Sequence, residues 1–414
     1  MMLRSLITAG LIALATPAWA DDGSDPWRDV DKNTGQIRDI AGLEQLARDF
    51  PDSGTVRLRL LQPLLDAGEI EKIMELLEWL YDRGYVFSEV AQQQIPKLLE
   101  GVDPGRIAER LRAQDEVVEA SEIIARLPAE ALLSESVIRS PASGRLLVST
   151  IIDRAVWYEK PDGTFGRYLS NTAANLSGMA ANASTGEVWV ASSYLDGATN
   201  TREGVVGLLR VKSGSAASKM VFADEGVNPS DLTIGPDQTL YASDPIGGGI
   251  YYATRNDERL QTLIEPGTFR SPQGLATSED GAKLYISDYR YGIAIVDLET
   301  LAISRIGSDI SVILDGVDGL WRHGSELIAV QNGTSPMRIS AFELSGDGMR
   351  VVGHRILEQA HSEWTEPLSG SIDGDALIYI GNGQWDRYIE GKLAQDTEAL
   401  PTQIRRLPLS ATDK

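Results

Sequence analysis

Short runs of hydrophobic residues recur through the last two thirds of the chain at a nearly regular spacing. Six of them begin at residues 146, 188, 240, 284, 327 and 377 and read LLVST, VWVAS, LYASD, LYISD, LIAVQ and LIYIG. The intervals, about 42 to 52 residues, leave room for several strands in each repeat, which is typical of propeller blades. The pattern predicts an all-β, six-bladed β-propeller over about residues 130–410. A β-sandwich is the alternative, but it has no reason to repeat six times at this period.

One repeat, residues 271–300, shows how the strands of a unit are separated. Its sequence is SPQGLATSEDGAKLYISDYRYGIAIVDLET. The apolar GLATS, KLYIS and YGIAIVDL are divided by polar residues that include Gly and Asp, which favour turns. We therefore expect GLATS to form the inner strand of the unit, followed by the second and third strands in chain order.

Before the repeats, residues 42–127 have the periodicity of helices rather than strands. In EIEKIMELLEWLYDRG, the apolar Ile70, Ile73, Leu77 and Leu80 recur at three- and four-residue steps, which places them on one helix face. We expect a small all-α domain of four or five short helices. Its sequence resembles one degenerate tetratricopeptide-type hairpin, which would suit a protein partner. A simple helical bundle packed on the next domain is the alternative.

The first 20 residues have the three parts of a secretory signal peptide. Arg4 is followed by an apolar run from Leu6 to Leu14, and small residues precede the expected cleavage after Ala20. A retained anchor is the alternative, but the run is shorter than the ~20 residues that span a bilayer. We expect residues 21–41 to be a polar lead-in to a periplasmic or secreted protein with no membrane span after cleavage.

Composition narrows the possible functions further. The 414 residues include 60 acidic and 38 Lys or Arg residues, a formal net charge of −22, and we find no basic patch in the sequence. Such a field repels phosphate backbones, so we expect no nucleic-acid partner. The chain has no cysteine, which excludes disulfides, thiolate metal sites and thiol nucleophiles.

Polar residues also recur at the expected entrances of the inner strands. Counting back about nine to eleven residues from each hydrophobic run reaches Glu135, Ser177, Ser230, Gln273, Asp318 and Glu366. Their oxygen atoms would form a ring at one mouth of the propeller channel, and hard oxygen donors suit Ca²⁺, Mg²⁺ or Mn²⁺. Crowded carboxylates need a cation, a shared proton or a basic partner. Carboxylates solvated by channel water, or bonded to backbone N–H groups, are the alternative.

Two further residues are candidates for substrate contact beside this ring. Asp231 follows Ser230 directly and could take its place. His361 precedes Glu366 on a segment that could cover the channel mouth, with a solvated loop histidine as the alternative. We expect Ser230, Asp231 and His361 to contact a small-molecule substrate or ligand.

The segments SESVIRSPASGRLLVST, NPSDLTIGPDQTLYASD, SPQGLATSEDGAKLYISD and VDGLWRHGSELIAVQNG resemble the gluconolactonase-like family that includes regucalcin. The resemblance covers nearly the whole chain after about residue 130 and none of the helical part. It implies a six-bladed propeller whose enzymes hydrolyse sugar lactones with a divalent cation at the channel mouth.

The resemblance also implies roles for individual residues. Glu135 matches the family's glutamate ligand, and Asp318 matches its aspartate, which is both a metal ligand and the proposed general base. Gln273 stands where the family has an asparagine ligand, and Ser230-Asp231 stand where it has another asparagine. Glutamine keeps the amide oxygen but adds a methylene group, so this position departs from the family pattern.

These observations lead to two hypotheses. In the first, the protein is an exported hydrolase whose cation, held by Glu135, Asp318, Gln273 and Glu366, polarises a lactone or ester carbonyl while Asp318 accepts a proton from water. Ca²⁺ is the first choice, with Mg²⁺, Mn²⁺ and Zn²⁺ as alternatives. In the second, the propeller binds a small molecule or a protein partner without catalysis.

Overall fold

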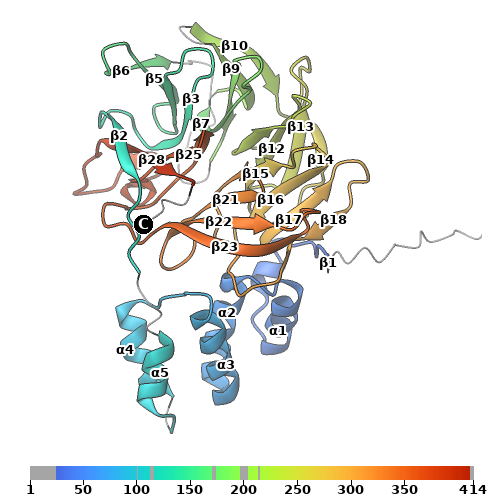
Figure 1. Ribbon diagram of the computed structural model, residues 1–414, viewed down its shortest axis with the longest axis vertical. Helices are drawn as coiled ribbons and strands as arrows, with labels where there is room; N and C mark the ends of the chain where they lie inside the picture. The colour runs from blue at the N-terminus through green and yellow to red at the C-terminus, as the bar shows by residue number, and fades with distance from the viewer. Residues whose placement is uncertain are drawn as a thin grey trace, which may run out of the picture.

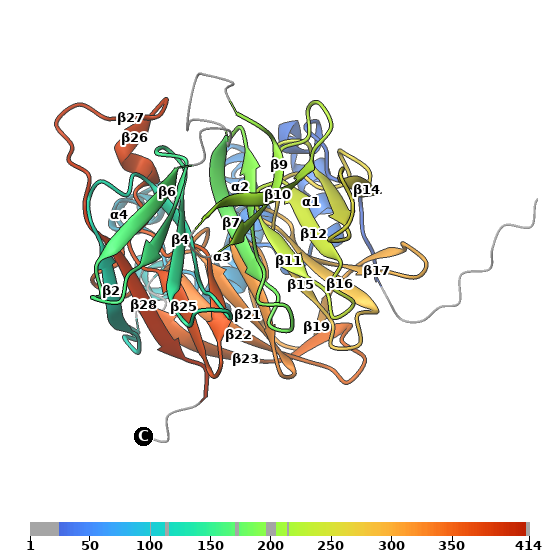
Figure 2. The same cartoon turned by 90° about the horizontal axis from the view of Figure 1, so that it is seen from above.

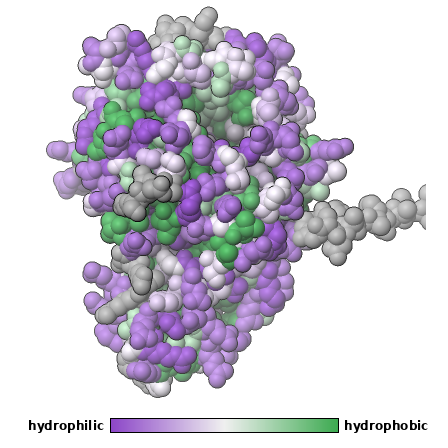
Figure 3. Space-filling model, in the orientation of Figure 1, coloured by the Kyte–Doolittle hydropathy of each residue, from purple (hydrophilic) through white to green (hydrophobic). Residues whose placement is uncertain are grey.

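The computed structural model describes residues 25–99, 101–111, 116–169, 174–195, 204–212 and 215–410. The expected signal peptide, residues 1–20, lies outside this range. Among the described residues, no helix combines the length and the apolar character needed to cross a membrane. Hydrophilic residues cover most of the face in Figure 3, including the helical part at the bottom, in keeping with the large net charge.

In the described part of the chain, five short helices lie between residues 40 and 111 and form a separate layer at the bottom of Figure 1. They are α1 (Ile40–Asp49), α2 (Gly54–Ala67), α3 (Ile70–Tyr81), α4 (Glu89–Leu98) and α5 (Pro104–Leu111). The first two begin at Asp39 and Ser53, whose side chains accept hydrogen bonds from backbone N–H groups of the first turn. The predicted apolar face of α3 is confirmed, since Ile73, Leu77 and Leu80 are completely buried.

The remainder of the described chain is mostly antiparallel sheet, as the hydrophobic pattern predicts. The first three sheets comprise β3 (Ser134–Arg139), β4 (Leu146–Thr150), β5 (Ala155–Glu159) and β6 (Phe165–Leu169); β7 (Asn175–Ala181), β8 (Val188–Ser193), β9 (Gly207–Lys212) and β10 (Ser215–Phe222); and β11 (Leu232–Ile234), β12 (Leu240–Asp244), β13 (Gly249–Ala253) and β14 (Gln261–Ile264). The fourth contains β15 (Pro272–Thr277), β16 (Lys283–Asp288), β17 (Gly292–Asp297), β18 (Ile303–Arg305) and β1 (Asp25–Pro26).

Two more large sheets and a small hairpin complete the described strands. The fifth sheet contains β20 (Gly319–His323), β21 (Glu326–Gln331), β22 (Arg338–Leu344), β23 (Arg350–Gln359) and β19 (Gly307–Ser308). The sixth contains β24 (Gly370–Asp373), β25 (Ala376–Ile380), β28 (Thr402–Pro408) and β2 (Glu122–Leu127), while β26 (Tyr388–Ile389) pairs with β27 (Lys392–Leu393). Two short 3₁₀ turns, Thr34–Gln36 and Trp385–Arg387, lie in connections.

The large sheets are arranged around a common axis, which Figure 1 views roughly end-on and Figure 2 views from the side. The first strands contact one another in the order β3, β7, β11, β15, β20 and β24, and β24 contacts β3 again. The six predicted hydrophobic runs all lie on the second strands of these sheets, β4, β8, β12, β16, β21 and β25. The spacing in the sequence therefore reports the position of one strand per sheet.

The sixth sheet is completed by β2, a strand that precedes the first sheet in the sequence. Strand β2 pairs with β28, with Glu122 opposite Arg406. The predicted helical domain, residues 42–127, is therefore too long: the described helices end at Leu111, and residues 122–127 are sheet. The reason is that their backbone groups pair with the C-terminal strand, a partner about 280 residues away.

A buried polar network supports this closure. The carboxylate of Glu358, which is 0% exposed, accepts hydrogen bonds from the Ser121 hydroxyl (2.7 Å) and the Tyr379 hydroxyl (2.6 Å). Arg405 Nε donates to the same Ser121 hydroxyl at 2.8 Å. Because the three partners lie on different segments, the network joins the start of β2 to the last two sheets.

The lead-in after the expected cleavage site is also attached to the sheets. Strand β1 pairs with β18, and the Trp27 indole donates to the carbonyl of Thr268 at 3.2 Å. The Trp27 ring packs against Phe50 at the end of α1 and Phe269 in the connection between β14 and β15, with centroids 5.0 and 5.3 Å away. The helices and sheets thus share a core, and residues 25–30 are ordered rather than loose.

Candidate functional site

The predicted ring of polar residues largely comes together at one end of the sheet axis. A cavity of about 440 Å³ is lined by five of its members, Glu135, Ser230, Gln273, Asp318 and Glu366. Each belongs to the start of an inner strand or to the segment that enters it. The repeat spacing therefore identified which side chains would meet, although they are far apart in the sequence.

The sixth member of the ring, Ser177, does not reach the cavity. It is 1% exposed, and its hydroxyl donates to the carbonyl of Ser230 at 2.7 Å. The next residue, Gly178, lies so close to Asp231 that an added Cβ would be 2.4 Å from the carboxylate. The second sheet is thus packed tightly against the third, which leaves no route for the Ser177 side chain into the cavity.

Asp318 is held in place by a residue that the sequence did not single out. Its Oδ2 accepts a hydrogen bond of 3.0 Å from Asn332 Nδ2, and Asn332 Oδ1 accepts one of 2.8 Å from the Tyr289 hydroxyl. Burial raises the pKa of Asp318 to about 6, although the bond from Asn332 opposes the rise. The one available signal was that Asn332 immediately follows the LIAVQ run.

Glu135 lines the same cavity as Asp318, and the two carboxylates repel each other electrostatically. Its Oε2 accepts a hydrogen bond of 2.9 Å from the Trp385 indole, which also lines the cavity. Burial, followed by the negative charge of Asp318, raises the pKa of Glu135 well above its usual range. The two carboxylates disfavour each other's ionised form, so a proton or a cation near them would stabilise the site.

Two more carboxylates add to this repulsion. Burial and the charge of Asp318 raise the pKa of Glu366 to about 7. Asp231 does not line the cavity, but burial raises its pKa to about 7, and the charge of Asp318 contributes. The basic side chain that lines this cavity is Arg270, so among the described lining residues negative charge is in excess.

The donor set suits a cation in its chemistry but is not assembled around one point. In the described part of the chain, no group of three or more Asp, Glu or His residues is arranged to hold a metal ion. Gln273 contributes an amide whose nitrogen donates to the Ser271 hydroxyl at 3.2 Å. Binding a divalent cation would require Glu135, Asp318 and Glu366 to move towards one another, a change that their mutual repulsion opposes until the cation is present.

Replacing Glu366 by Gln tests this repulsion. The pKa of Glu366 is about 7 in the folded protein, against an ordinary value of 4.5. Its carboxyl group therefore contributes stability that is fully present below pH 4.5 and is lost as the pH rises through about 7. Without a cation, we therefore expect E366Q to be more stable than the wild type at pH 8, by about 1–3 kcal/mol, and to differ little near pH 5. Urea denaturation with chelator at both pH values measures this.

The matched control for this prediction is Glu130→Gln, which removes an exposed carboxylate elsewhere. We expect its free energy of unfolding to follow that of the wild type at both pH values. If E366Q and the wild type showed the same dependence on pH, Glu366 would not be under electrostatic repulsion in the folded protein.

His361, predicted as a substrate contact, is not at the cavity. It is 7% exposed, its Nδ1 accepts a hydrogen bond from the backbone N–H of Glu363 (3.0 Å), and its Nε2 lies 2.6 Å from an Arg405 guanidinium nitrogen. Its ring stacks on Trp364, with centroids 5.8 Å apart. The prediction was wrong because packing beside the closing strand turns this side chain into the protein rather than over the channel.

Comparison with known proteins gives only distant likenesses. No family model and no curated protein matches the sequence. Among solved structures, a gluconolactonase from Xanthomonas campestris shares 18% identity over 71% of this chain and 91% of its own, with a TM-score of 0.48.

Two other neighbours are a calcium-binding protein and a dehydrogenase. Regucalcin from Agrobacterium tumefaciens, a calcium-binding protein, shares 15% identity over 69% of this chain and 93% of its own (TM-score 0.46). The PQQ-bound aldose sugar dehydrogenase of Streptomyces coelicolor shares 14% over 71% of this chain and 99% of its own (TM-score 0.45). The structural neighbours of the chain thus include gluconolactonases and regucalcin, together with an enzyme of another class.

Proposed function

We propose that this protein is a divalent-cation-dependent hydrolase that opens a lactone or related ester at the channel mouth of a six-bladed β-propeller. The six large sheets would be the blades. The observation that carries the proposal is the cavity in which Glu135, Asp318 and Glu366 face a common space, with Asp318 oriented by Asn332. Carboxylates with raised pKa values in a cleft are typical of catalytic sites.

In this proposal each residue has a distinct role. Glu135, Asp318 and Glu366, with the amide oxygen of Gln273, would hold the cation, which supplies Lewis-acid polarisation of the ester carbonyl. Asp318, with a pKa of about 6, is ionised at neutral pH and can accept a proton from an attacking water molecule. The hydrogen bond from Asn332 fixes the orientation of the Asp318 carboxylate. The Ser230 hydroxyl lies at the same cavity and would contact the substrate.

A non-catalytic binding protein is the second candidate. The observation that favours it is that three cation ligands do not converge among the described residues, together with the longer Gln273 at a ring position. In that case the cavity would bind a small molecule, and the helical layer would be available to a protein partner. Under either function, we propose that the N-terminal segment exports the protein to the periplasm or the exterior.

A lactone panel separates the two candidates. Purified protein would be assayed with five- and six-membered sugar lactones and simple esters, in Ca²⁺, Mg²⁺, Mn²⁺ or Zn²⁺ and in chelator. We expect turnover that requires one of these cations. Turnover that chelator leaves unchanged would contradict the cation-dependent mechanism, whereas lactone binding without turnover under every condition would support the binding protein.

Removing one anionic ligand should weaken the cation's effect on stability. A ligand present at 100 times its Kd stabilises the folded state by about 2.7 kcal/mol, so a tenfold loss of affinity removes about 1.4 kcal/mol of this. We therefore expect Glu135→Gln to show a smaller cation-induced rise in melting temperature than the wild type. Glu130→Gln, the exposed control, should keep the full rise. An unchanged rise in E135Q would show that Glu135 is not a ligand.

A further inference from the structure

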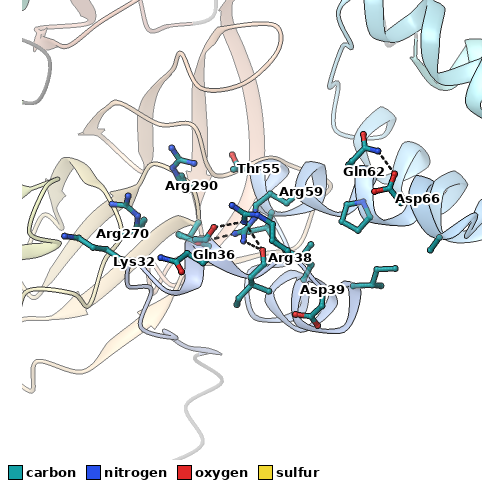
Figure 4. A pocket seen from close by; sticks show the side chains of 18 residues that line it. Lys32, Gln36, Arg38, Asp39, Thr55, Arg59, Gln62, Asp66, Arg270 and Arg290 are labelled. Carbon is teal, nitrogen blue, oxygen red and sulfur yellow. Dashed lines mark hydrogen bonds between the residues drawn. The ribbon is translucent and has the colours of Figure 1, made fainter. Parts of the chain in front are cut away.

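A second and larger cavity lies where the helices meet the sheets. Its volume is about 1100 Å³, and it is bounded by α1, α2, the preceding 3₁₀ turn and connections of the fourth sheet. Five basic side chains line it: Lys32, Arg38, Arg59, Arg270 and Arg290. Figure 4 shows that they come from separate segments and lie on the left and in the middle of the view, whereas Gln62 and Asp66 lie on the right. In a chain with a net charge of −22, such a concentration of positive charge is unexpected.

These basic residues lack acidic partners. Among the described residues, none of the five forms an ion pair with a carboxylate, although other Arg residues of the chain do, including Arg28 with Asp49 nearby. Two acidic residues, Asp39 and Asp66, also line the cavity, so among its described lining residues five positive charges face two negative ones. Asp39 accepts a hydrogen bond from the backbone N–H of Gly42 (2.8 Å), and Asp66 accepts one from Gln62 (2.7 Å) on the far side of the cavity in Figure 4.

Two of the five basic side chains, Arg38 and Arg59, are held in place by hydrogen bonds to backbone carbonyls. Arg59 is half-buried, and its guanidinium donates to the carbonyls of Thr34 (3.1 Å) and Ile37 (2.9 Å). Arg38 donates to the carbonyls of Gly35 (2.7 Å) and Ile37 (3.0 Å). Since carbonyl groups position these guanidinium groups without neutralising them, their positive charge remains available to a ligand.

From the cavity, its cations without carboxylate ion pairs and the fixed positions of Arg38 and Arg59, we infer a binding site for a small molecule that carries several carboxylate or phosphate groups. The volume of this cavity is slightly above the ~300–1,000 Å³ of typical small-molecule sites. Several cations around one space favour a multivalent anion over a single charge, because each anionic group can meet its own partner. The overall negative field disfavours nucleic acid as the occupant. The inference does not depend on the proposed hydrolase activity.

The test uses citrate and pyrophosphate as a tricarboxylate and a phosphate probe, with glucose as the neutral comparison. Isothermal titration calorimetry of the whole purified protein would be done at constant ionic strength. We expect at least one anion to bind and glucose not to bind, and the better anion identifies the preferred group. Absence of binding by both anions would overturn the inference.

The variant for this test is the double substitution Lys32→Gln with Arg290→Gln. Both side chains are exposed and neither lines the acidic cavity, so folding and the candidate catalytic site should be preserved. We expect the double variant to bind the anion about tenfold more weakly. Lys97→Gln, which removes an exposed cation on α4, should bind like the wild type. Equal affinity in the double variant and the wild type would overturn the site.

A final comparison keeps the two sites apart. Asp318→Asn alters the acidic cavity alone and should leave anion binding unchanged. Arg270 lines both cavities, so it is left intact in the test variant. If the hydrolase proposal failed while the double variant still lost anion binding, the basic site would stand by itself.

Discussion

Asp318→Asn is expected to lower kcat for lactone hydrolysis by about 10²- to 10⁴-fold, the usual contribution of a positioned general base. The substitution preserves the shape of the side chain and an oxygen that can accept the hydrogen bond from Asn332. It removes the group that takes the proton from water, because an amide is not basic at neutral pH. Steady-state kinetics with the best lactone of the panel, at saturating cation, measures the effect.

The matched control is Asp29→Asn, which removes an exposed carboxylate that does not line the cavity. It should retain the wild-type kcat and KM. Circular dichroism and the melting temperature of D318N establish that the fold is intact, so that lost activity reports on chemistry. If D318N kept the wild-type kcat in the presence of the same cation, Asp318 would not be the base and the assigned mechanism would be wrong.

The sequence was most informative where the fold repeats. All six hydrophobic runs lie on second strands, because these central strands are buried on both faces and so read as continuous apolar stretches. The strand at residues 122–127 carried no such signal. It is an outer strand and is half exposed. It pairs with β28, whose residues lie about 280 positions later in the sequence. Local periodicity cannot report a pairing of that kind.

In the cavity, too, the sequence predicted the residues that follow the repeat and missed those that depend on side-chain direction. The repeat spacing predicted that Glu135, Gln273 and Asp318 would lie at one cavity, because equivalent positions of a repeat occupy equivalent positions in the fold. It did not indicate Asn332 or Trp385, which follow the fifth and sixth hydrophobic runs and donate hydrogen bonds to the carboxylates. Their roles depend on side-chain directions at strand ends and in a 3₁₀ turn, which the spacing of apolar residues does not specify.

Asp315→Ala is expected to destabilise the protein by about 3–5 kcal/mol, because it removes a buried acceptor shared by several donors. The carboxylate, 2% exposed, accepts hydrogen bonds from the backbone N–H groups of Gly54 (2.7 Å) and Thr55 (2.8 Å) and from the Ser53 hydroxyl (3.2 Å). These donors are the start of α2, so a side chain from the connection between β19 and β20 caps a helix of the preceding layer. Urea denaturation at pH 7 measures the loss.

Asp347→Ala is the matched control for this variant, since burial is what makes Asp315 costly to remove. Asp347 also accepts hydrogen bonds from a backbone N–H (Met349, 3.0 Å) and a serine hydroxyl (Ser345, 2.6 Å), but it is exposed. Water can replace it, so we expect a loss below about 1 kcal/mol. At Asp315 no such replacement is available, and the buried Arg338 also loses a neighbouring negative charge. Equal losses in the two variants would mean that the start of α2 does not depend on Asp315.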